Sequence, residues 1–467
     1  MARVIVYYFA EKGEIFYDGL CDSLVQNGND VLRVNIFKIV AQNKFKLEYS
    51  FKDNSIIDKI LQFNPEIIMS YNNAFPFHLF PDEYIGKTYL FDADNPEYFW
   101  HKEEIKKHYS SLKFLGLQKD SPGFYQKVLG IEIPQESYAY FPAATKVQSS
   151  DITQDKNISF IGTNFPSEFN FNALFYNETG LAIYDEIKNN YFVNPEKLYA
   201  TNDFFYKNLP LKSFKELFYA LKFYYIKVDR IKSISCLCDL GLALYGVSWT
   251  GCNMFFDPEI AACFRDEDII TLQDNENVYN SSRIAVNISH PQATTAFSWR
   301  VMDIMASNAC ILMERKQDWF DLFGQYISQE VIDAIIYDDR YDMRRKAKLL
   351  LDDKKLRSRC VKECQDAIKQ NGRWEHRFKI LEEMSGVKII NLPKENATIE
   401  IIKKQEVLKS PNKLNMRSKF IQKCYDSSLI IGAAGIFALT TIPIIGSFIK
   451  RSKLFPKATQ ILIRRGS

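Results

Sequence analysis

Short apolar runs alternate with amphipathic segments along the first 141 residues of the chain. The runs are rich in β-branched and aromatic residues, which is typical of buried strands, and they lie at 3–9, 31–36, 67–70, 87–91, 114–118 and 138–141. Between them, residues 15–27 and 56–63 carry apolar side chains at helical spacing. Strands that alternate with helices predict a parallel α/β sheet. The polar stretch at 147–156, which follows this region, is typical of a linker.

A second alternation of the same kind begins at residue 158. Its predicted strands are 158–161, 243–245, 284–287 and 310–313, and its helices are 230–239, 299–305 and a region within 349–384. The pattern predicts an α/β protein with two Rossmann-like halves that face a cleft, where ligands bind beyond the carboxyl ends of the strands. The expected parts are a first domain at 1–150, a second at 151–390 with an aromatic helical insertion at about 165–228, and a helical tail at 391–467.

Composition indicates a folded protein of ordinary make-up. Its 467 residues are 46% hydrophobic and 25% charged, which suits a globular protein of two or three domains. The nine cysteines form no CxxC pair, and the five histidines form no cluster with metal-ligand spacing. We therefore expect reduced thiols, no bound metal and a cytoplasmic protein; the N-terminus has the pattern of a strand and not of a signal peptide.

The formal charge of +3 is the sum of two unlike parts. Residues 401–467 carry 13 basic and two acidic side chains, so this tail has a charge of +11 and residues 1–400 a charge of −8. An acidic body argues against nucleic acid as a partner. Within the tail, residues 429–449 are uncharged and flanked by basic residues. Such a segment can span a bilayer or form a buried hairpin, and the flanking charges favour a membrane surface.

The most informative segment is the predicted strand, loop, helix and strand at 279–312. Ser298 is placed to cap the helix, and Arg300 and Asp303 lie one turn apart on one face of it. An arginine near a helix start can bind a phosphate, and a nearby carboxylate can accept hydrogen bonds from a ribose diol. The spacing fits an exposed ion pair equally well, so both interpretations stay open on the residues alone.

The same segment carries a family resemblance, through Tyr279, Asn280, Asn287, Ser298, Arg300 and Ala306. It resembles the C-terminal module of CgeB-type, spore maturation protein-like glycosyltransferases, which belong to the group 1 glycosyltransferases. Other pieces similar to that family occur in the expected order, at 91–96, 140–144, 160–163, 244–249 and 374–377. The resemblance covers about residues 1–385.

The resemblance implies a GT-B fold and a hexosyltransferase that moves a sugar from a nucleotide-sugar donor to a glycan, lipid-linked or protein acceptor, as in the synthesis of surface polysaccharides or glycoconjugates. It implies no cofactor besides this donor substrate. Arg300 would neutralise the donor diphosphate and Asp303 would contact the ribose. The candidate donor-binding residues are Gly162, Thr163, Tyr245, Gly246, Asn287, His290, Ser298, Arg300 and Asp303; of these, His290 is included because it follows a predicted strand.

Three positions depart from the family pattern. Asp303 is one methylene shorter than the usual Glu, and Asn308 replaces the Gly that usually follows the helix; we expect both to be tolerated, because Asn also adopts left-handed conformations. Thr295 stands where related retaining enzymes carry an acidic residue. This leaves open whether configuration is retained, and it keeps a non-catalytic glycan- or nucleotide-binding scaffold as an alternative.

Asp92 and Asp94 form a separate candidate site after the strand at 87–91. An Asp-x-Asp motif after a strand is also how metal-dependent GT-A transferases hold a divalent cation and the donor diphosphate. Because a second α/β half follows, we assign these aspartates to the acceptor side, where one of them is a candidate general base for an acceptor hydroxyl.

Overall fold

The computed structural model describes residues 1–10, 14–36, 55–72, 74, 75, 77, 80–96, 99, 102–164, 229–246, 249, 258–393 and 396–402. The chain divides into two compact units. The first comprises Met1–Gly246 and Arg265–Lys403, and the second comprises Val247–Phe264 and Lys404–Ser467, in which α12 spans Pro258–Cys263. The predicted insertion at 165–228 and almost the whole tail, with its apolar segment at 429–449, lie outside the described residues.

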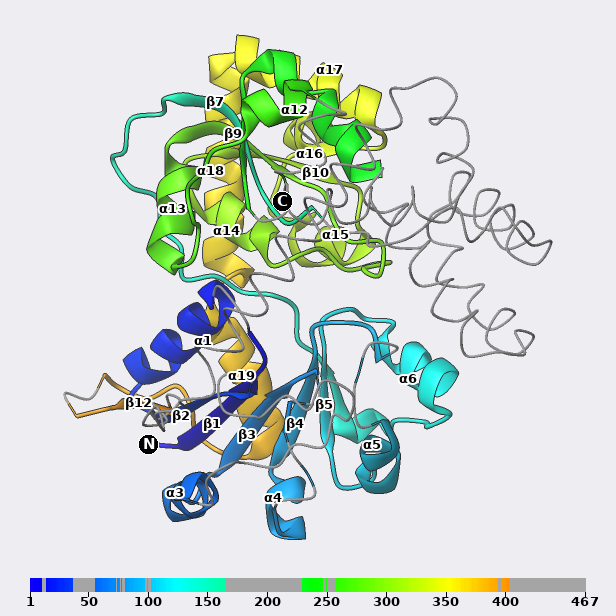
Figure 1. Cartoon of the computed structure of the whole chain (residues 1–467), viewed down its shortest axis with the longest axis vertical. Helices are drawn as coiled ribbons and strands as arrows, with labels where there is room; N and C mark the ends of the chain where they lie inside the picture. The colour runs from blue at the N-terminus through cyan, green and yellow to red at the C-terminus, as the bar shows by residue number, and fades with distance from the viewer. Residues whose placement is uncertain are drawn as a thin grey trace, which may run out of the picture. The chain divides into compact units, whose positions relative to one another are not determined.

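The first unit contains a seven-stranded parallel sheet with the order β12-β2-β1-β3-β4-β5-β6 (Figure 1). Its strands are β1 Arg3–Tyr8, β2 Asp30–Asn35, β3 Ile67–Tyr71, β4 Thr88–Asp92, β5 Lys113–Gly116, β6 Tyr138–Tyr140 and β12 Ile399–Ile402. The helices between them are α1 Ile15–Gln26, α3 Ser55–Phe63, α4 Asp82–Gly86, α5 Lys102–His108 and α6 Ser121–Leu129. Each strand predicted in this half is present, with bounds that shift by one or two residues.

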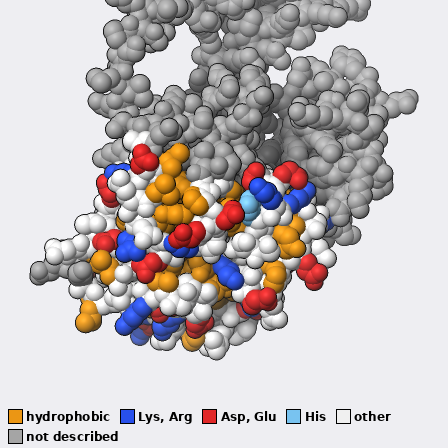
Figure 2. Space-filling view, turned by 90° about the horizontal axis from the view of Figure 1, so that it is seen from below, with side chains coloured by type: hydrophobic (Ala, Val, Ile, Leu, Met, Phe, Trp, Pro, Cys, Tyr) orange, Lys and Arg blue, Asp and Glu red, His pale blue; other side chains and the backbone are white. Residues whose placement is uncertain are grey.

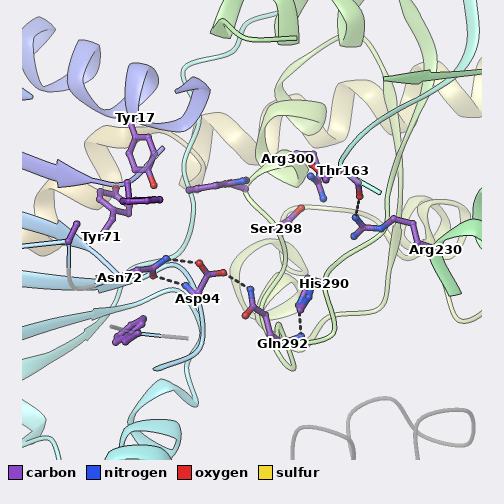
Figure 3. A pocket seen from close by; sticks show the side chains of 14 residues that line it. Tyr17, Tyr71, Asn72, Asp94, Thr163, Arg230, His290, Gln292, Ser298 and Arg300 are labelled. Carbon is purple, nitrogen blue, oxygen red and sulfur yellow. Dashed lines mark hydrogen bonds between the residues drawn. The ribbon is translucent and has the colours of Figure 1, made fainter. Parts of the chain in front are cut away.

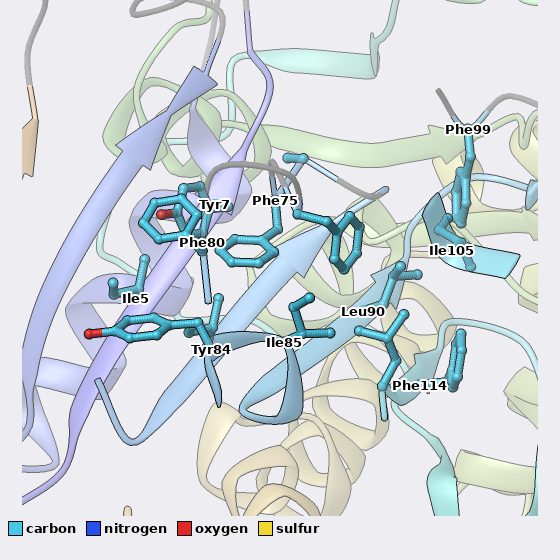
Figure 4. Packing of buried hydrophobic residues seen from close by; sticks show 14 of the residues in the cluster. Ile5, Tyr7, Phe75, Phe80, Tyr84, Ile85, Leu90, Phe99, Ile105 and Phe114 are labelled. Atoms are coloured by element: carbon cyan, nitrogen blue, oxygen red, sulfur yellow. The ribbon is translucent and has the colours of Figure 1, made fainter. Parts of the chain in front are cut away.

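Two hydrophobic cores cover the two faces of this sheet. Along β1, Ile5 and Tyr7 point to one core, while Val4, Val6 and Tyr8 point to the other, as the two-residue period of a strand requires. The first core packs beneath α3, α4, α5 and α6 (Figure 4). A strand buried on both faces is apolar throughout, which is why these strands are visible in the sequence.

The second sheet has five parallel strands in the order β11-β10-β9-β7-β8. Its strands are β7 Lys156–Ile161, β8 Leu242–Tyr245, β9 Ser282–Asn287, β10 Cys310–Glu314 and β11 Ile336–Tyr337. Around it lie α13 Leu272–Asn280, α14 Arg300–Ala306, α15 Gln317–Phe323, α16 Gln329–Ile335, α17 Arg340–Asp352 and α18 Lys354–Asn371. Of these five strands, four were predicted and β11, which is two residues long, was not; the helices α13, α15 and α16 were not predicted either. The predicted α/β class with two Rossmann-like sheets is confirmed.

The end of the described chain returns to the first sheet. Helix α19, Trp374–Ser385, buries Trp374, Phe378 and Leu381 in the core that also contains α1. Strand β12 then pairs with β2 in parallel. Residues 374–402 therefore pack with the N-terminal core, whereas the sequence division assigned them to the second domain and the tail. Their apolar spacing predicts a helix but cannot indicate which sheet that helix covers.

The surface of the first-sheet half mixes charges of both signs. Seen from below, acidic and basic side chains are interspersed with scattered apolar ones on the described part of this face (Figure 2). In the described part of the chain, no helix is long and apolar enough to cross a membrane.

Candidate functional site

A cavity of about 590 Å³ lies where the carboxyl ends of strands from both sheets meet (Figure 3). The first-sheet half contributes residues that follow β1, β3 and β4 and one residue of α1, and the second contributes residues around β7, β9 and α14. The lining residues are Phe9, Tyr17, Tyr71, Asn72, Ala74, Asp94, Phe99, Thr163, Arg230, His290, Gln292, Ser298, Trp299 and Arg300. This is the position at which Rossmann-like sheets bind ligands.

Arg300 presents a guanidinium to the cavity from the first position of α14. The side chain is half-buried and lies over the Phe160 ring, with Cζ 5.9 Å from the ring centroid. Its Nε is buried without a hydrogen-bond partner, and the described residues supply it with no ion pair. Leaving a buried donor unsatisfied costs about 1–3 kcal/mol, so the cavity contains a cation that is ready to bind an anionic or polar group.

The predicted glycines bring β7 and β8 close together beside this arginine. The Gly162 amide donates to the Tyr245 carbonyl at 3.0 Å. Gly246 has a φ of +116°, and a Cβ placed there would collide with the Gly162 carbonyl oxygen. A side chain at Gly246 would therefore separate the strand ends, and a Cβ at Gly162 would collide with the Phe160 ring. Gly162, Tyr245 and Gly246 therefore shape the backbone behind the cavity, whereas Thr163 lines it. Tyr245 is buried, which raises the pKa of its phenol to about 12.

Ser298 and Asn287 act together at the edge of the cavity. The Ser298 hydroxyl donates to Asn287 Oδ1 at 2.6 Å, and Asn287 is fully buried. The expected cap by Ser298 is not formed, because α14 begins one residue later than predicted, with Trp299 at the N-cap position and no side-chain cap. Asn287 does not reach the cavity; it holds Ser298, which does.

His290 lines the cavity in the loop that follows β9, as its position in the sequence suggested. Its Nδ1 accepts a hydrogen bond from the Gln292 amide at 3.2 Å.

Asp303 is not among the residues that line the cavity. Its Oδ1 accepts from the Thr145 hydroxyl at 2.5 Å and its Oδ2 accepts from Asn275 Nδ2 at 2.9 Å. Burial raises the pKa of Asp303 to about 7, against the lowering effect of these hydrogen bonds and of Arg300. The carboxylate that the sequence places beside Arg300 is thus engaged by Thr145, which lies between β6 and β7, and by Asn275 of α13.

The two aspartates of the Asp-x-Asp motif have different surroundings. Asp92 is buried at the end of β4, where Oδ1 accepts from the Leu117 amide at 2.8 Å; burial raises its pKa well above the usual range. Asp94 reaches the cavity. The two carboxylates bind different partners, and no group of three or more His, Cys, Asp or Glu side chains able to hold a metal occurs among the described residues.

Two amides hold the Asp94 carboxylate in place. Asn72 Nδ2 donates to Oδ2 at 2.6 Å, and Asn72 Oδ1 accepts from the Asp94 amide at 2.9 Å. From the other sheet, Gln292 Nε2 donates to Oδ1 at 2.5 Å (Figure 3). Burial raises the pKa of Asp94, and the hydrogen bonds from Gln292 and Asn72 lower it in part. Each oxygen keeps one further lone pair for a ligand hydroxyl.

Sequence reasoning missed several lining residues. Arg230 is buried, and donates to the carbonyls of Thr163 at 2.6 Å and Ile288 at 3.1 Å. The Trp299 ring packs against Phe16 of α1, with ring centroids 3.9 Å apart and the planes tilted by 36°. No local pattern indicates a contact over so long a separation. By contrast, Asn72, with a φ of +46°, directly follows β3, and the rule that ligands bind at strand ends would have identified it.

Other residues of the family pattern hold the linker between the sheets. Asn280 donates to the Gln148 carbonyl at 2.9 Å and accepts from the Asn308 amide at 2.9 Å. Asn308 is not left-handed as expected, since Asn64 and Asn72 are the described non-glycine residues with positive φ. Its side-chain amide instead donates to the Ser150 carbonyl, and this hydrogen bond accounts for asparagine at that position.

Two parallel Rossmann-like sheets whose carboxyl ends share one cavity form the GT-B arrangement of an α/β protein. The fold class is therefore that of GT-B proteins. Residues 244–383 match the model of a family described as glycosyl transferase-like, so this part of the chain is a glycosyltransferase-like domain. It contains α14 with Arg300 and the loop that carries His290 and Gln292.

Three solved structures illustrate the likeness in fold. T4 phage β-glucosyltransferase is 10% identical, with a TM-score of 0.42, over 83% of this chain and 100% of that one. WaaG, a glycosyltransferase involved in lipopolysaccharide biosynthesis, is 9% identical with a TM-score of 0.45, over 82% and 100%. Sucrose-phosphate synthase from Thermosynechococcus elongatus is 8% identical with a TM-score of 0.48, over 82% and 98%. No curated protein matches the chain.

Proposed function

We propose that the protein is a glycosyltransferase that uses a nucleotide-sugar donor, and that Arg300 binds the donor diphosphate. The observation that carries this proposal is the guanidinium of Arg300, which faces the cavity without a hydrogen bond or ion pair from the described residues. Arginine matches the geometry of phosphate oxygens with two parallel N–H donors. Thr163, His290 and Ser298 line the same side of the cavity and add polar groups.

Asp94 is the proposed general base on the opposite side. The step is a direct displacement in which the acceptor hydroxyl transfers its proton to Asp94 while its oxygen bonds to the anomeric carbon. The bond from that carbon to the diphosphate breaks, and its electron pair leaves with the nucleoside diphosphate, whose charge Arg300 stabilises. Burial raises the pKa of Asp94 above its ordinary value, and a carboxylate with a raised pKa is a stronger base toward the acceptor hydroxyl. Such a displacement inverts the configuration of the sugar.

The experiment is a donor screen. Thermal unfolding is measured with UDP, GDP and common nucleotide sugars, because a ligand that binds only the folded protein stabilises it by mass action. Release of nucleoside diphosphate from mixed donors then tests turnover, with and without EDTA. Release that stops on chelation and returns with Mn²⁺ would favour metal-dependent chemistry at Asp92 and Asp94. Binding of nucleotides without release from any donor would favour the non-catalytic scaffold.

We further propose that the basic tail at 401–467 attaches the enzyme to an anionic membrane surface, which suits a lipid-linked or surface-glycan acceptor. The support is its charge of +11 around the uncharged segment at 429–449, since each basic residue near an anionic surface adds about 1 kcal/mol of attraction. In co-sedimentation with vesicles, the full chain should bind phosphatidylserine vesicles and a chain ending at residue 402 should not. Equal binding by both would place the membrane contact elsewhere.

A further inference from the structure

The two sides of the cavity differ in chemistry. Its two arginines, Arg230 and Arg300, both come from the second-sheet half, as does His290. The first-sheet half contributes the carboxylate of Asp94 and no basic side chain to the described lining. A ligand that extends through the cavity would therefore place its phosphates on the second-sheet side, because the other side offers an anion no counter-charge.

The first-sheet side is a wall of aromatic rings. Phe9, Tyr17, Tyr71 and Phe99 line it, and Trp299 from the other half lies beside them. These rings are held by packing: Tyr17 and Tyr71 meet edge to face at 4.9 Å, and Tyr17 and Trp299 do so at 6.2 Å. A wall of this kind is rigid before a ligand arrives, so little ordering entropy is lost on binding.

Polar groups are set into this wall at a few points. Asp94, Asn72 and Gln292 form one linked group, described above. Tyr71 is 1% exposed, and its hydroxyl is buried with no hydrogen-bond partner. Tyr17 lies close enough to Asp94 for that carboxylate to raise the pKa of its phenol further, beyond the effect of burial.

We infer that the first-sheet side binds the acceptor through a neutral sugar ring, so that the acceptor hydroxyl belongs to a saccharide. This inference rests on the proposed function and specifies its acceptor. A pyranose has apolar C–H faces that pack on aromatic rings, and hydroxyls that bind carboxylate and amide groups. A lipid phosphate would need a cation, and the described lining of this side has none.

The test uses methyl glycosides as probes, namely those of glucose, galactose, mannose and N-acetylglucosamine. Binding to the full chain in the presence of UDP or GDP is followed by saturation-transfer NMR. We expect transfer to the ring C–H protons of at least one glycoside. Affinity should fall about tenfold in Tyr17→Ala and in Asp94→Asn, and about threefold in Tyr71→Phe. Tyr341→Ala is the matched control, since Tyr341 is 72% exposed on α17 and does not line the cavity.

The outcomes separate this inference from the proposed function. If nucleotides bind in an Arg300-dependent manner but no glycoside does, the sugar acceptor is refuted and the donor site stands. Farnesyl phosphate and a serine-containing peptide are assayed in parallel, and binding of either in place of the glycosides also refutes the inference. Glycoside affinities that are equal in wild type and Tyr71→Phe, Tyr17→Ala and Asp94→Asn would place any sugar site elsewhere. Glycoside binding without nucleotide binding would support the saccharide site and refute the donor site.

Discussion

Replacing Arg300 with alanine should weaken donor binding strongly while leaving the fold as stable as before. Most buried arginines are stabilised by the partners that they hold, so their removal destabilises the protein. Arg300 has neither a hydrogen bond nor an ion pair from the described residues, and its buried Nε is unsatisfied. Arg300→Ala should therefore reduce donor binding without reducing the stability of the fold.

The magnitudes follow from the surroundings of the guanidinium. Loss of its position over the Phe160 ring removes about 0.5–1 kcal/mol of cation–π attraction. Removal of an unsatisfied buried donor returns about 1–3 kcal/mol, so the free energy of unfolding should stay within about 1 kcal/mol of wild type or rise. Two charge-assisted hydrogen bonds to a diphosphate contribute about 3–5 kcal/mol, which corresponds to a loss of roughly 150- to 5,000-fold in kcat/KM.

The assay pairs urea unfolding with nucleoside diphosphate release, for wild type, Arg300→Ala and Arg300→Lys. The lysine variant keeps the charge and loses the two-pronged geometry, so its activity should lie between the others. Arg315→Ala is the matched control, because Arg315 also lies over a phenylalanine, with Cζ 5.3 Å from the Phe320 ring centroid, but outside the cavity and paired with Asp338. Wild-type turnover by a folded Arg300→Ala protein would remove Arg300 from the mechanism.

Three further predictions concern buried charge. Burial raises the pKa of Asp303 to about 7 from 3.8, so between about pH 4 and 7 the folded protein holds a proton that the unfolded chain has lost. The free energy of unfolding should therefore decline across this pH range, by at most ~4 kcal/mol. In urea unfolding, Asp303→Asn should show a smaller decline than wild type, and an equal decline would assign the pH dependence to other groups. Gln292→Ala removes a hydrogen bond that lowers the pKa of Asp94, so the acidic limb of the pH profile of kcat/KM should move to higher pH; an unmoved limb would mean that this limb does not report Asp94. In wild type, Arg33 binds the carboxylates of Glu14 and Asp18 at 2.5 Å. Arg33→Met leaves both carboxylates without their cation and should lower the free energy of unfolding in urea by about 3 kcal/mol. Loss of the exposed ion pair in Lys87→Met should lower it by less than ~0.5 kcal/mol, and equal losses in the two variants would contradict the buried pairing.

The local sequence pattern was sufficient to predict features that depend on neighbouring residues, such as strands and the residues that follow them. β1 and β3 are buried on both faces, so their apolar character is continuous and marks them as strands of a parallel sheet. Arg300 could be identified because it stands at a helix start that follows a strand and loop. Thr163 and His290 could be identified for the related reason that each follows a strand, and the structure places all three at the cavity.

The role of a carboxylate could not be decided in this way. Asp92 and Asp94 are two residues apart at the end of one strand, yet Asp92 is bound by the Leu117 amide and Asp94 faces the cavity. Asp303 shares a helix face with Arg300, but Thr145 and Asn275 occupy its oxygens. For Asp92 and Asp303, the outcome depends on partners that the fold brings from 25 to 158 residues away in the chain.

The sequence by itself determined the fold class, with its two α/β halves, and a glycosyltransferase-like segment that carries Arg300. Only the tertiary structure decided what surrounds that arginine. Trp299 lies on Phe16 and Gln292 holds Asp94 because two distant halves of the chain meet at the cavity. The physical reason is that strand and helix patterns record the burial of each residue on its own element, whereas a site depends on which elements pack against one another, and local spacing carries no information about that.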